Sequence, residues 1–401
     1  MPVLLPDPMN LPAQRRCPLD PPDEYAQLRE ERPMSRLRLP GGRVGWLVTR
    51  YEDVRATLAD PRFTPPLIQV TPNADLPLPE EELQVPPGMF SALDPPEQSR
   101  YRRLVSKHFT RKRMRELAPR IEQIVEEQIS GMIAAGPPAD LVKWFSQPIP
   151  TRVITEMLGI PARDQADYQR WIITTLTLSS TPEQLREIVV GLGGSLTELV
   201  RAKRKEPGDD IISELLHGER GLTDDEALNI SILLLIAGLE TTANMLGLGA
   251  FALLQHPDQA AALRADPAGL DVAIEELLRY LTIVQFGLTR TAREDVVIAG
   301  QQIRAGETVV ASLASANRDP RCYEDPDRLD VFRQETPHMA FGHGVHQCLG
   351  AQLARVEMKI AFEALLRRLP TLRLAVPPEE VPTGEDKVFY GVHSLPVTWD
   401  S

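Results

Sequence analysis

The chain has 401 residues, a hydrophobic fraction of 42% and a formal net charge of −12. This hydrophobic fraction is typical of a globular protein with a substantial core. The acidic balance argues against nucleic acid as the main partner, because phosphate binding needs a dominant basic surface. Three cysteines, Cys17, Cys322 and Cys348, are too few for a disulfide framework and favour a reducing cytoplasm. The proline-broken N-terminus lacks the continuous apolar stretch of a signal peptide or membrane anchor.

The first element expected along the chain is a β-hairpin over residues 34–50, where apolar and polar positions alternate around Gly41-Gly42. Helical patterns follow, with apolar residues at three-to-four spacing, over 100–125, 151–158, 184–205 and 271–280. Short strands are expected at 296–298 and 308–311. No Gly/Ser linker separates these pieces, so the sequence predicts a mainly α-helical single domain with a minor β portion over 1–401, with residues 1–16 loosely attached.

The longest expected helix covers residues 223–256. Thr223, with Glu226 three residues later, forms a capping box at its start, and Pro257 stops it. After the acidic first turn its only charged residue is Glu240, so the helix is apolar on every face and belongs in a protein core or in a bilayer. The acidic start and the carboxylate in the middle favour the core.

The segment 341–350 combines three glycines, two histidines and Cys348. Helical spacing begins directly after it, over 351–369, so Cys348 lies at a helix N-terminus, where the dipole and free backbone N–H groups favour a thiolate. Glycines let a loop approach a flat cofactor closely, and one thiolate is what a haem iron needs for O–O cleavage. Two other interpretations stay open from these residues alone: a structural helix-cap cysteine, and a metal site formed by Cys348 with His338, His343 and His346.

These ten residues resemble the haem-binding signature F-G-x-G-x-H-x-C-x-G of bacterial cytochrome P450 enzymes. The resemblance implies that Cys348 is the axial ligand of haem b and that His346 donates to a haem propionate. It implies that Phe341 shields the sulfur and that Gly350 lets the following helix lie against the ring. It also implies the cytochrome P450 fold, with the haem between the long central helix and the helix after the cysteine loop.

A second match lies in the long helix, where residues 237–242 read A-G-L-E-T-T and resemble the family's A-G-x-(D/E)-T-T segment. Ala237 and Gly238 are expected to leave room for a diatomic ligand beside the iron. Glu240 and Thr241 place an acid next to an alcohol, which suits proton delivery into an apolar pocket. This pair favours a monooxygenase over a gas sensor or carrier, and over a peroxide-driven oxygenase, on the same fold.

Further segments follow in the family's order. Glu276 and Arg279, three apart on one helix face, together with Arg333 resemble the Glu-Arg-Arg network that holds the cysteine loop in family members. This resemblance assigns the three residues a structural role.

Haem propionates need cationic partners, and the forked guanidinium of arginine suits a carboxylate. Arg290 opens a segment that resembles the family's R-x-A-x-E-D turn, and Arg102 lies in one that resembles its D-P-P-E-H-x-R-x-R helix start. Gln98 stands where histidine is commoner, so its expected propionate contact ranks below that of Arg102.

The chain has no glycine-rich flavin or nicotinamide motif and no cysteine cluster for an iron–sulfur centre. The two electrons that a monooxygenase needs are therefore expected from a separate ferredoxin and ferredoxin reductase. Residues 100–115 hold eight Lys or Arg and no Asp or Glu. This basic stretch is either a solvated helix face or a docking surface for an acidic ferredoxin.

Similarity to actinobacterial family members implies a bulky hydrophobic substrate, a polyketide, macrolide or comparable secondary metabolite, that is hydroxylated or epoxidised. The walls of its pocket are expected from apolar residues of five separate segments. The residues singled out are Phe90, Leu233, Ala237, Phe286, Leu288 and Val392.

Overall fold

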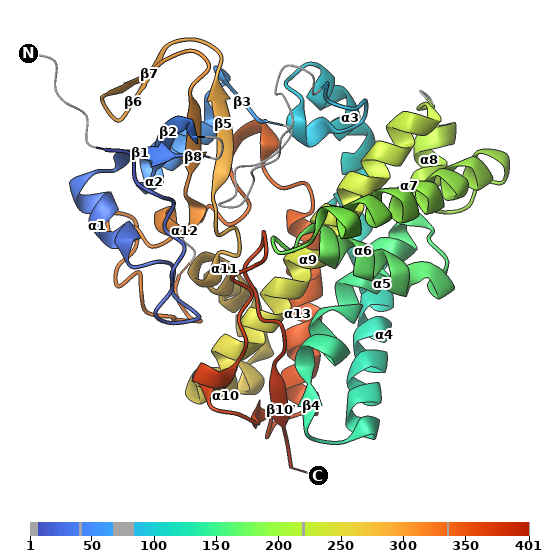
Figure 1. Cartoon of the computed structure of the whole chain (residues 1–401). Helices are drawn as coiled ribbons and strands as arrows, with labels where there is room; N and C mark the ends of the chain where they lie inside the picture. The colour runs from blue at the N-terminus through green and yellow to red at the C-terminus, as the bar shows by residue number, and fades with distance from the viewer. Residues whose placement is uncertain (1–6, 40–41, 67–83, 219–220, 335–336, 401) are drawn as a thin grey trace, which may run out of the picture. The chain divides into compact units, whose positions relative to one another are not determined.

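The structure, a computed structural model, describes residues 7–39, 42–66, 84–218, 221–334 and 337–400. Helices dominate, and the described residues fall into two compact units, coloured along the chain in Figure 1. The first, called the β unit here, takes its residues from Met1–Val85, Ser91–Asp94 and Glu275–Cys348. The second, called the helical unit, takes its residues from Pro86–Phe90, Pro95–Ile274 and Leu349–Ser401.

The β unit is built on a five-stranded sheet in the order β1-β2-β8-β5-β3. Strands β2 and β8 are parallel, and the other neighbours are antiparallel. A separate two-stranded sheet pairs β6 with β7. The elements of this unit are α1 (Glu24–Glu31), β1 (Met34–Arg38), β2 (Val44–Val48), α2 (Tyr51–Ala59), β3 (Phe63–Thr64), β5 (Leu288–Ala292), β6 (Val296–Ile298), β7 (Gln301–Ile303), β8 (Thr308–Ala311), α12 (Leu313–Ala316) and η8 (Gly344–His346).

The predicted hairpin is confirmed, because β1 and β2 pair antiparallel in register from Met34 opposite Val48 to Arg38 opposite Val44. Of its glycine turn, Gly41 lies outside the described residues. The predicted strands at 296–298 and 308–311 are confirmed as β6 and β8.

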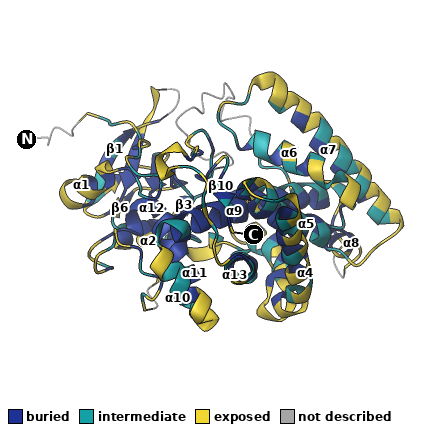
Figure 2. Cartoon of the chain, turned by 90° about the horizontal axis from the view of Figure 1, so that it is seen from below, coloured by how far each residue is buried: buried dark blue, intermediate teal, exposed yellow. Residues whose placement is uncertain are grey.

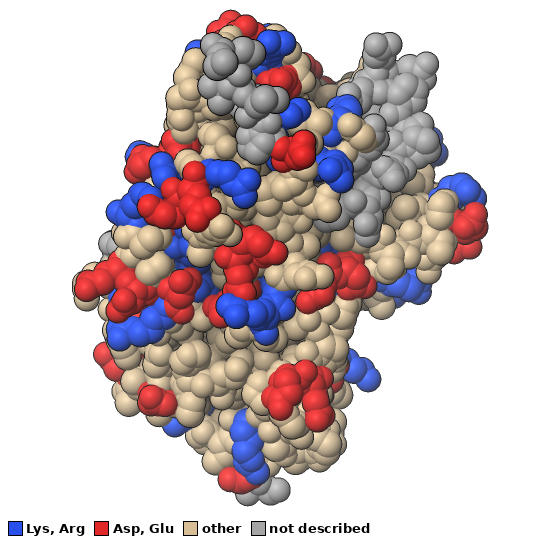
Figure 3. Space-filling model, turned by 60° about the vertical axis from the view of Figure 1, so that its left-hand side comes forward, with Lys and Arg blue, Asp and Glu red and all other residues tan. Residues whose placement is uncertain are grey.

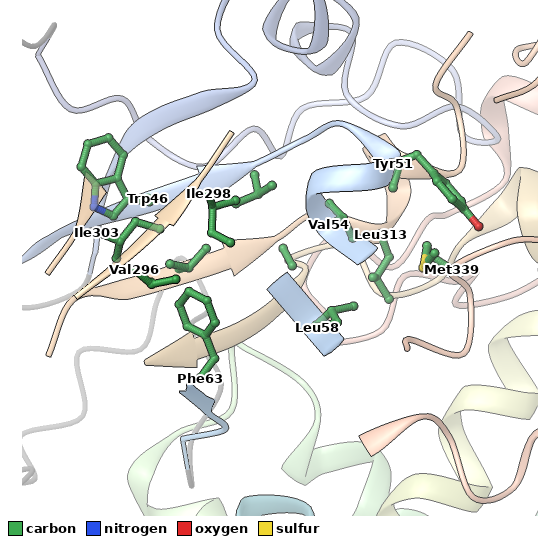
Figure 4. Packing of buried hydrophobic residues seen from close by; sticks show 14 of the residues in the cluster. Trp46, Tyr51, Val54, Leu58, Phe63, Val296, Ile298, Ile303, Leu313 and Met339 are labelled. Carbon is green, nitrogen blue, oxygen red and sulfur yellow. The ribbon is translucent and has the colours of Figure 1, made fainter. Parts of the chain in front are cut away.

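The sheet of the β unit is buried on both faces. Successive side chains of a strand point to opposite faces, and two core clusters divide accordingly. Trp46 and Val48 belong to one cluster, together with α2 and the β6-β7 hairpin (Figure 4), whereas Leu47 belongs to the other, beside α1. Burial on both faces explains why β8 reads as a continuous apolar run rather than an alternating one.

The helical unit is an assembly of helices with a small three-stranded sheet in the order β4-β10-β9. Two elements, η3 (Phe90–Ala92) and α11 (Leu270–Leu281), contribute residues to both units. The elements of the helical unit are α3 (Glu97–Ser106), η4 (Lys107–Phe109), α4 (Arg111–Ala135), β4 (Ala139–Asp140), η5 (Val142–Ser146), α5 (Pro148–Leu158), η6 (Ala162–Asp164), α6 (Gln165–Thr175), α7 (Pro182–Lys205), α8 (Ile211–His217), α9 (Asp224–Gln255), α10 (Pro257–Ala265), η7 (Pro267–Gly269), α13 (Ala351–Arg368), β9 (Arg373–Leu374), η9 (Pro378–Glu380) and β10 (Pro396–Thr398).

Helix α9 is the core of the helical unit. The predicted capping box is confirmed, because Thr223 Oγ1 accepts a hydrogen bond from Glu226 N and the Glu226 carboxylate accepts one from Thr223 N. Within the described part of the chain, α9 is the one helix long and apolar enough to cross a membrane, yet 67% of its most apolar window is buried. Figure 2 shows it as a dark ribbon, whereas α4 and α7 carry exposed outer faces. It is the core helix that the sequence favoured.

Two glycines of α9 let neighbouring helices approach closely. A Cβ atom on Gly238 would lie 3.0 Å from Ile154 Cγ1 of α5, and one on Gly249 would lie 2.6 Å from Phe362 Cζ of α13. Contacts this close leave no room for a methyl group. The structure thus places α13, the helix after the cysteine loop, directly against α9 within this unit.

The helix expected over 100–125 is instead two helices. Helix α3 ends at Ser106, a short 3₁₀ turn follows, and Thr110 begins α4 by accepting a hydrogen bond on Oγ1 from Arg113 N at 3.3 Å. An N-cap has extended rather than helical backbone angles, so it interrupts a helix even where the apolar spacing continues. The other predicted helices are confirmed as α5, α7, α11 and α13.

Candidate functional site

The cysteine loop is folded by hydrogen bonds between its own backbone groups. Gly342 N donates to Met339 O at 2.8 Å, Gln347 N to Gly344 O at 3.0 Å, and Cys348 N to Phe341 O at 2.9 Å. The last bond closes the loop over the segment of the predicted signature. Cys348 is an exposed thiol at the end of this loop.

Two glycines of the loop are required by its shape. Gly342 and Gly344 have φ angles of +68° and +76°, a region that side chains disfavour. A Cβ atom on Gly344 would lie 2.6 Å from the carbonyl oxygen of Leu58 in α2. A Cβ atom on Gly342 would lie 3.4 Å from Leu288 Cδ1, so the loop passes directly beside the start of β5.

The structure brings Glu276, Arg279 and Arg333 together. The Arg279 guanidinium makes a bidentate pair with the Glu276 carboxylate at 2.7 and 2.8 Å, and Arg333 Nε lies 3.2 Å from the same carboxylate. Arg279 also donates to the carbonyl oxygens of Asn317 and Pro326, both at 2.8 Å. Glu276 and Arg279 are almost completely buried, and this cluster is called the Glu-Arg-Arg brace below.

Sequence reasoning missed the segment that connects this brace to the cysteine loop. Asn317 Oδ1 accepts a hydrogen bond from Met339 N at 2.6 Å, and its Nδ2 donates to Thr282 at 2.8 Å. Next to it, Arg318 is buried, pairs with Asp20 and stacks 3.7 Å from the centroid of the Tyr280 ring. The signal was in the sequence, because three consecutive polar residues follow an apolar helix.

The predicted shield Phe341 lies beside His338, with ring centroids 5.9 Å apart. His338 Nε2 lies 3.1 Å from Glu275 Oε2, and its Nδ1 accepts a hydrogen bond from Ala340 N, so this histidine serves the local fold. Over the described ranges, no group of three or more His, Cys, Asp or Glu side chains is arranged to hold a metal ion.

Arg290 is a buried cation in β5. Its Nη1 donates to the carbonyl oxygen of Thr289 at 2.8 Å, and among the described residues no carboxylate lies within ion-pair distance of it. Burial lowers the pKa of Arg290 to about 10, opposed only by the more distant Asp94. Side chains two apart on a strand share a face, so Arg290 lies on the same face as Leu288, which contacts Gly342 of the cysteine loop. A buried arginine without a counter-charge beside this loop fits a cofactor that carries carboxylates.

In the helical unit, one face in the middle of α9 is only partly covered by other residues, and this face is called the uncovered stripe below. Leu233 and Thr241 are half-buried and Ala237 is exposed, at a spacing of four residues that places them on one face. A Cβ atom on Gly238 would lie 3.0 Å from Ile154 Cγ1, so this position faces α5. The expectation that Ala237 and Gly238 leave room for a diatomic ligand stays a prediction.

The predicted acid and alcohol do not form a hydrogen bond with each other within the described structure. Thr241 is half-buried, and its Oγ1 donates to Ala237 O at 2.6 Å. Glu240 is buried, and its Oε2 accepts from Asn244 Nδ2 at 3.1 Å and lies 3.7 Å from Lys387 Nζ. Glu240 is thus buried, Thr241 is half-buried, and the two side chains have separate partners. The role of this acid and alcohol in proton delivery stays a prediction. Sequence reasoning missed Lys387, which has no motif around it.

The remaining predicted residues belong to several elements. In the helical unit, Gln98 is buried and Arg102 half-buried on α3, and Gly350 is the N-cap of α13, with no atom within 4 Å of its Cβ position. Phe90 and Val392 of this unit are buried, as is Phe286 of the β unit, whereas Leu288 and His346 of the β unit are half-buried.

The basic stretch at 100–115 is partly neutralised within the helical unit. Arg100 pairs with Glu226 at 3.0 Å, Lys107 pairs with Glu214, and Arg113 pairs with Glu116 at 3.3 Å. Figure 3 shows one face of the molecule, on which acidic and basic side chains are intermixed. The density of positive charge in the sequence therefore overstates the positive field at this surface.

Comparison with known proteins shows which family combines the cysteine loop, the Glu-Arg-Arg brace and the long helix α9. Residues 269–393 match the family model described as cytochrome P450. The chain is 46% identical over 392 residues to cytochrome P450 105C1 of a Streptomyces species, covering 98% of this chain and 99% of that protein. It is 41% identical over 380 residues to the mycinamicin IV hydroxylase/epoxidase of Micromonospora griseorubida, covering 94% of each.

Solved structures agree with this match. The crystal structure of CYP105P1 in complex with filipin I superposes with a TM-score of 0.92 at 42% identity, covering 98% of this chain and 99% of that chain. Fold and sequence match together over nearly the whole length. This chain therefore belongs to the cytochrome P450 family of monooxygenases.

Proposed function

We propose that the protein binds haem b through Cys348 and uses electrons from a separate ferredoxin and ferredoxin reductase to hydroxylate or epoxidise a bulky apolar secondary metabolite. The observation that carries this proposal is the exposed Cys348 thiol at the end of a glycine loop that is closed by backbone hydrogen bonds and connected to the Glu-Arg-Arg brace through Asn317. The absence of a disulfide framework supports a cytoplasmic location.

Different residues of the chain are proposed to bind different parts of the cofactor. The Cys348 thiolate would hold the haem iron, and Arg290, His346 and Arg102 would bind the propionates, with a smaller contribution from Gln98. Phe341 covers the sulfur, and Gly350 leaves the start of α13 open. When bound, the haem supplies the activation of dioxygen at its iron.

The role proposed for α9 is the handling of protons. Glu240 passes protons from its buried carboxyl group, and Thr241 Oγ1 moves them on beside the uncovered stripe of the helix. Because Thr241 Oγ1 donates to Ala237 O, its hydroxyl is oriented and its lone pairs remain able to accept. Ala237, with its small side chain, keeps this face accessible.

The proposed substrate class rests on two supports. The names of the relatives include an enzyme that acts on mycinamicin IV and a structure that binds filipin I. The residues assigned to the pocket are apolar: Phe90, Leu233, Ala237, Phe286, Leu288 and Val392. Mycinamicin IV and filipin I are therefore the first substrate probes, scored by the shift of the haem absorption on binding and by mass-spectrometric detection of a product one oxygen heavier.

The decisive experiment is the carbon monoxide difference spectrum of the reduced protein. We expect the band characteristic of thiolate-ligated haem in the wild type and its loss in Cys348→Ser. A wild-type protein that binds haem without this band would overturn the proposal.

The two alternatives on the same fold are separated by turnover. A monooxygenase makes product with ferredoxin, reductase and nicotinamide cofactor, a peroxide-driven oxygenase makes it with hydrogen peroxide alone, and a sensor or carrier makes none under either condition. The ferredoxin is expected to dock on the basic stretch at 100–115. Glutamate in place of both Lys112 and Arg113 should slow reduction and leave the spectrum unchanged.

A further inference from the structure

Glu240, the acid of α9, forms a buried ion pair with Lys387. Lys387 Nζ and Glu240 Oε2 are 3.7 Å apart, and both side chains are at least nine-tenths buried. Asn244, one helical turn after Glu240, donates from Nδ2 to the same carboxylate oxygen at 3.1 Å. Over the described residues, the other oxygen, Oε1, has no hydrogen-bond partner. One oxygen of the acid is thus anchored and the other is available.

The segment 383–393, which carries Lys387, is fixed to the rest of the helical unit by its backbone. Val388 N donates to Leu176 O at 2.9 Å, and Leu178 N donates to Asp386 O at 2.6 Å, on either side of a bridge between Thr177 and Lys387. The backbone from which the Lys387 side chain extends is therefore fixed within the helical unit.

Asn244 ties the same segment to α9. Its Nδ2 also donates to Phe389 O at 3.2 Å, and its Oδ1 would lie only 2.0 Å from a Cβ atom on Gly391. The close approach requires glycine at 391. Glu240, Asn244 and the C-terminal segment form one contiguous polar contact inside an otherwise apolar core.

An isolated carboxylate in such a core is very costly, and proteins avoid this state by pairing the charge or by taking up a proton. We infer that Lys387 is a positioning residue for proton delivery: its ammonium keeps Glu240 ionised, fixes Oε2 and leaves Oε1 to exchange protons. This inference rests on the proposed role of Glu240. It also makes the C-terminal segment, which includes the expected pocket residue Val392, a determinant of how the acid is presented.

Infrared difference spectroscopy on the substrate-free holoenzyme tests the pairing without turnover. Apart from the amide bands of the introduced glutamine, we expect the wild type minus Glu240→Gln to show the stretch of an ionised carboxylate and no C=O stretch of a carboxylic acid. The Lys387→Met protein minus the Lys387→Met/Glu240→Gln protein should instead show the C=O stretch of a carboxylic acid. An ionised carboxylate in both difference spectra would overturn the inference, since Lys387 would then not be needed to hold the charge.

The functional arm measures coupling, the product formed per nicotinamide cofactor consumed, with filipin I as the substrate probe. A positioned proton-transfer group contributes roughly 10²-fold or more to rate, so we expect Lys387→Met to lower coupling about tenfold and Lys387→Arg to restore most of it. In the Glu240→Gln background, Lys387→Met should cause no further loss, because Lys387 acts through Glu240. An additive loss in the double variant would contradict this.

Lys359→Met is the matched control, because Lys359 forms an exposed ion pair with Asp271 at 2.8 Å. It should leave both readouts at the wild-type level. Failure of the proposed function would appear separately, as a wild type without the thiolate–haem band, and the infrared comparison would still report on the pair.

Discussion

The cysteine loop and the middle of α9 are supported in opposite ways. Below the loop, the Glu-Arg-Arg brace and Asn317 bind backbone carbonyl and amide groups through buried charged and polar side chains. Around α9, the contacts are apolar side chains seated on glycines, with Glu240 and its partners as the main polar exception. Directional hydrogen bonds and ion pairs fix the loop, whereas close packing of apolar side chains fixes the helix.

This difference follows from how a loop and a helix satisfy their backbone hydrogen bonds. A loop has few backbone bonds of its own, so its shape must be imposed by groups that recognise individual carbonyl and amide groups. A helix satisfies its own backbone and needs only correct packing to fix its position. We therefore expect the removal of one charge below the loop to cause a large loss of unfolding free energy. Around α9, we expect the change in unfolding free energy to be proportional to the number of atoms added or removed.

The largest expected effect is that of Arg279→Met. Removing Arg279 leaves the buried Glu276 carboxylate with Arg333 as its remaining cation and leaves the carbonyl oxygens of Asn317 and Pro326 without this donor. Breaking a buried ion pair in this way costs about 3–5 kcal/mol of unfolding free energy. Urea unfolding measures this cost, and haem content measures the consequence for the loop. The exposed pair of Arg328 with Asp330 provides the control, because Arg328→Met should change little. Equal effects of the two variants would contradict the brace.

The next effect concerns Glu357 of α13, which is completely buried and whose Oε2 has no hydrogen-bond partner in the described chain. Burial raises the pKa of Glu357 from its ordinary 4.5 to about 8. Between these values the native state holds a proton that the unfolded chain has released, so the unfolding free energy falls as pH rises through this window. At pH 7 the loss amounts to roughly 3 kcal/mol.

Glu357→Met removes this titration. Thermal unfolding between pH 5 and pH 8 should show the wild type losing stability relative to Glu357→Met as pH rises. A constant difference between the two proteins across this range would mean that Glu357 is not held protonated.

The smallest effect is that of a methyl group on α9. Gly249→Ala should cost about 1–3 kcal/mol, because its Cβ would overlap the buried ring of Phe362. Gly193→Ala in α7 is the matched control, since no atom lies within 4 Å of its Cβ position, and it should gain about 0.5–1 kcal/mol from helix propensity. Denaturant midpoints compare the two, and a second change, Phe362→Leu, should recover part of the loss in Gly249→Ala.

Much of the fold was predictable because its signals are local. The capping box at Thr223, the hairpin around residues 34–50 and the helix after Cys348 each follow from residues close together in the sequence. The break at Thr110 was not predicted, since the apolar period runs through it and only the cap geometry reveals the stop. The prediction of a single domain over 1–401 stays a prediction.

The candidate site divides in the same way. Motifs led to Cys348 and to the Glu-Arg-Arg brace, whose members the structure brings together. Lys387 and Arg318 were missed because their importance comes from long-range burial, which no local pattern encodes. The contact of Gly238 with α5 could not be predicted, because a small residue serves helix packing and ligand access equally well, and the sequence does not give the direction of its Cβ position.

The buried charge of Arg290 bears on the yield of folded protein. A buried charge without a counter-charge destabilises the β unit, and the haem propionates that we propose for Arg290 would offset this cost. A ligand that binds only the native state raises the population of that state by mass action. The yield of folded protein in a cell should therefore follow the supply of haem precursor during synthesis, which makes the cofactor a component of folding as well as of chemistry.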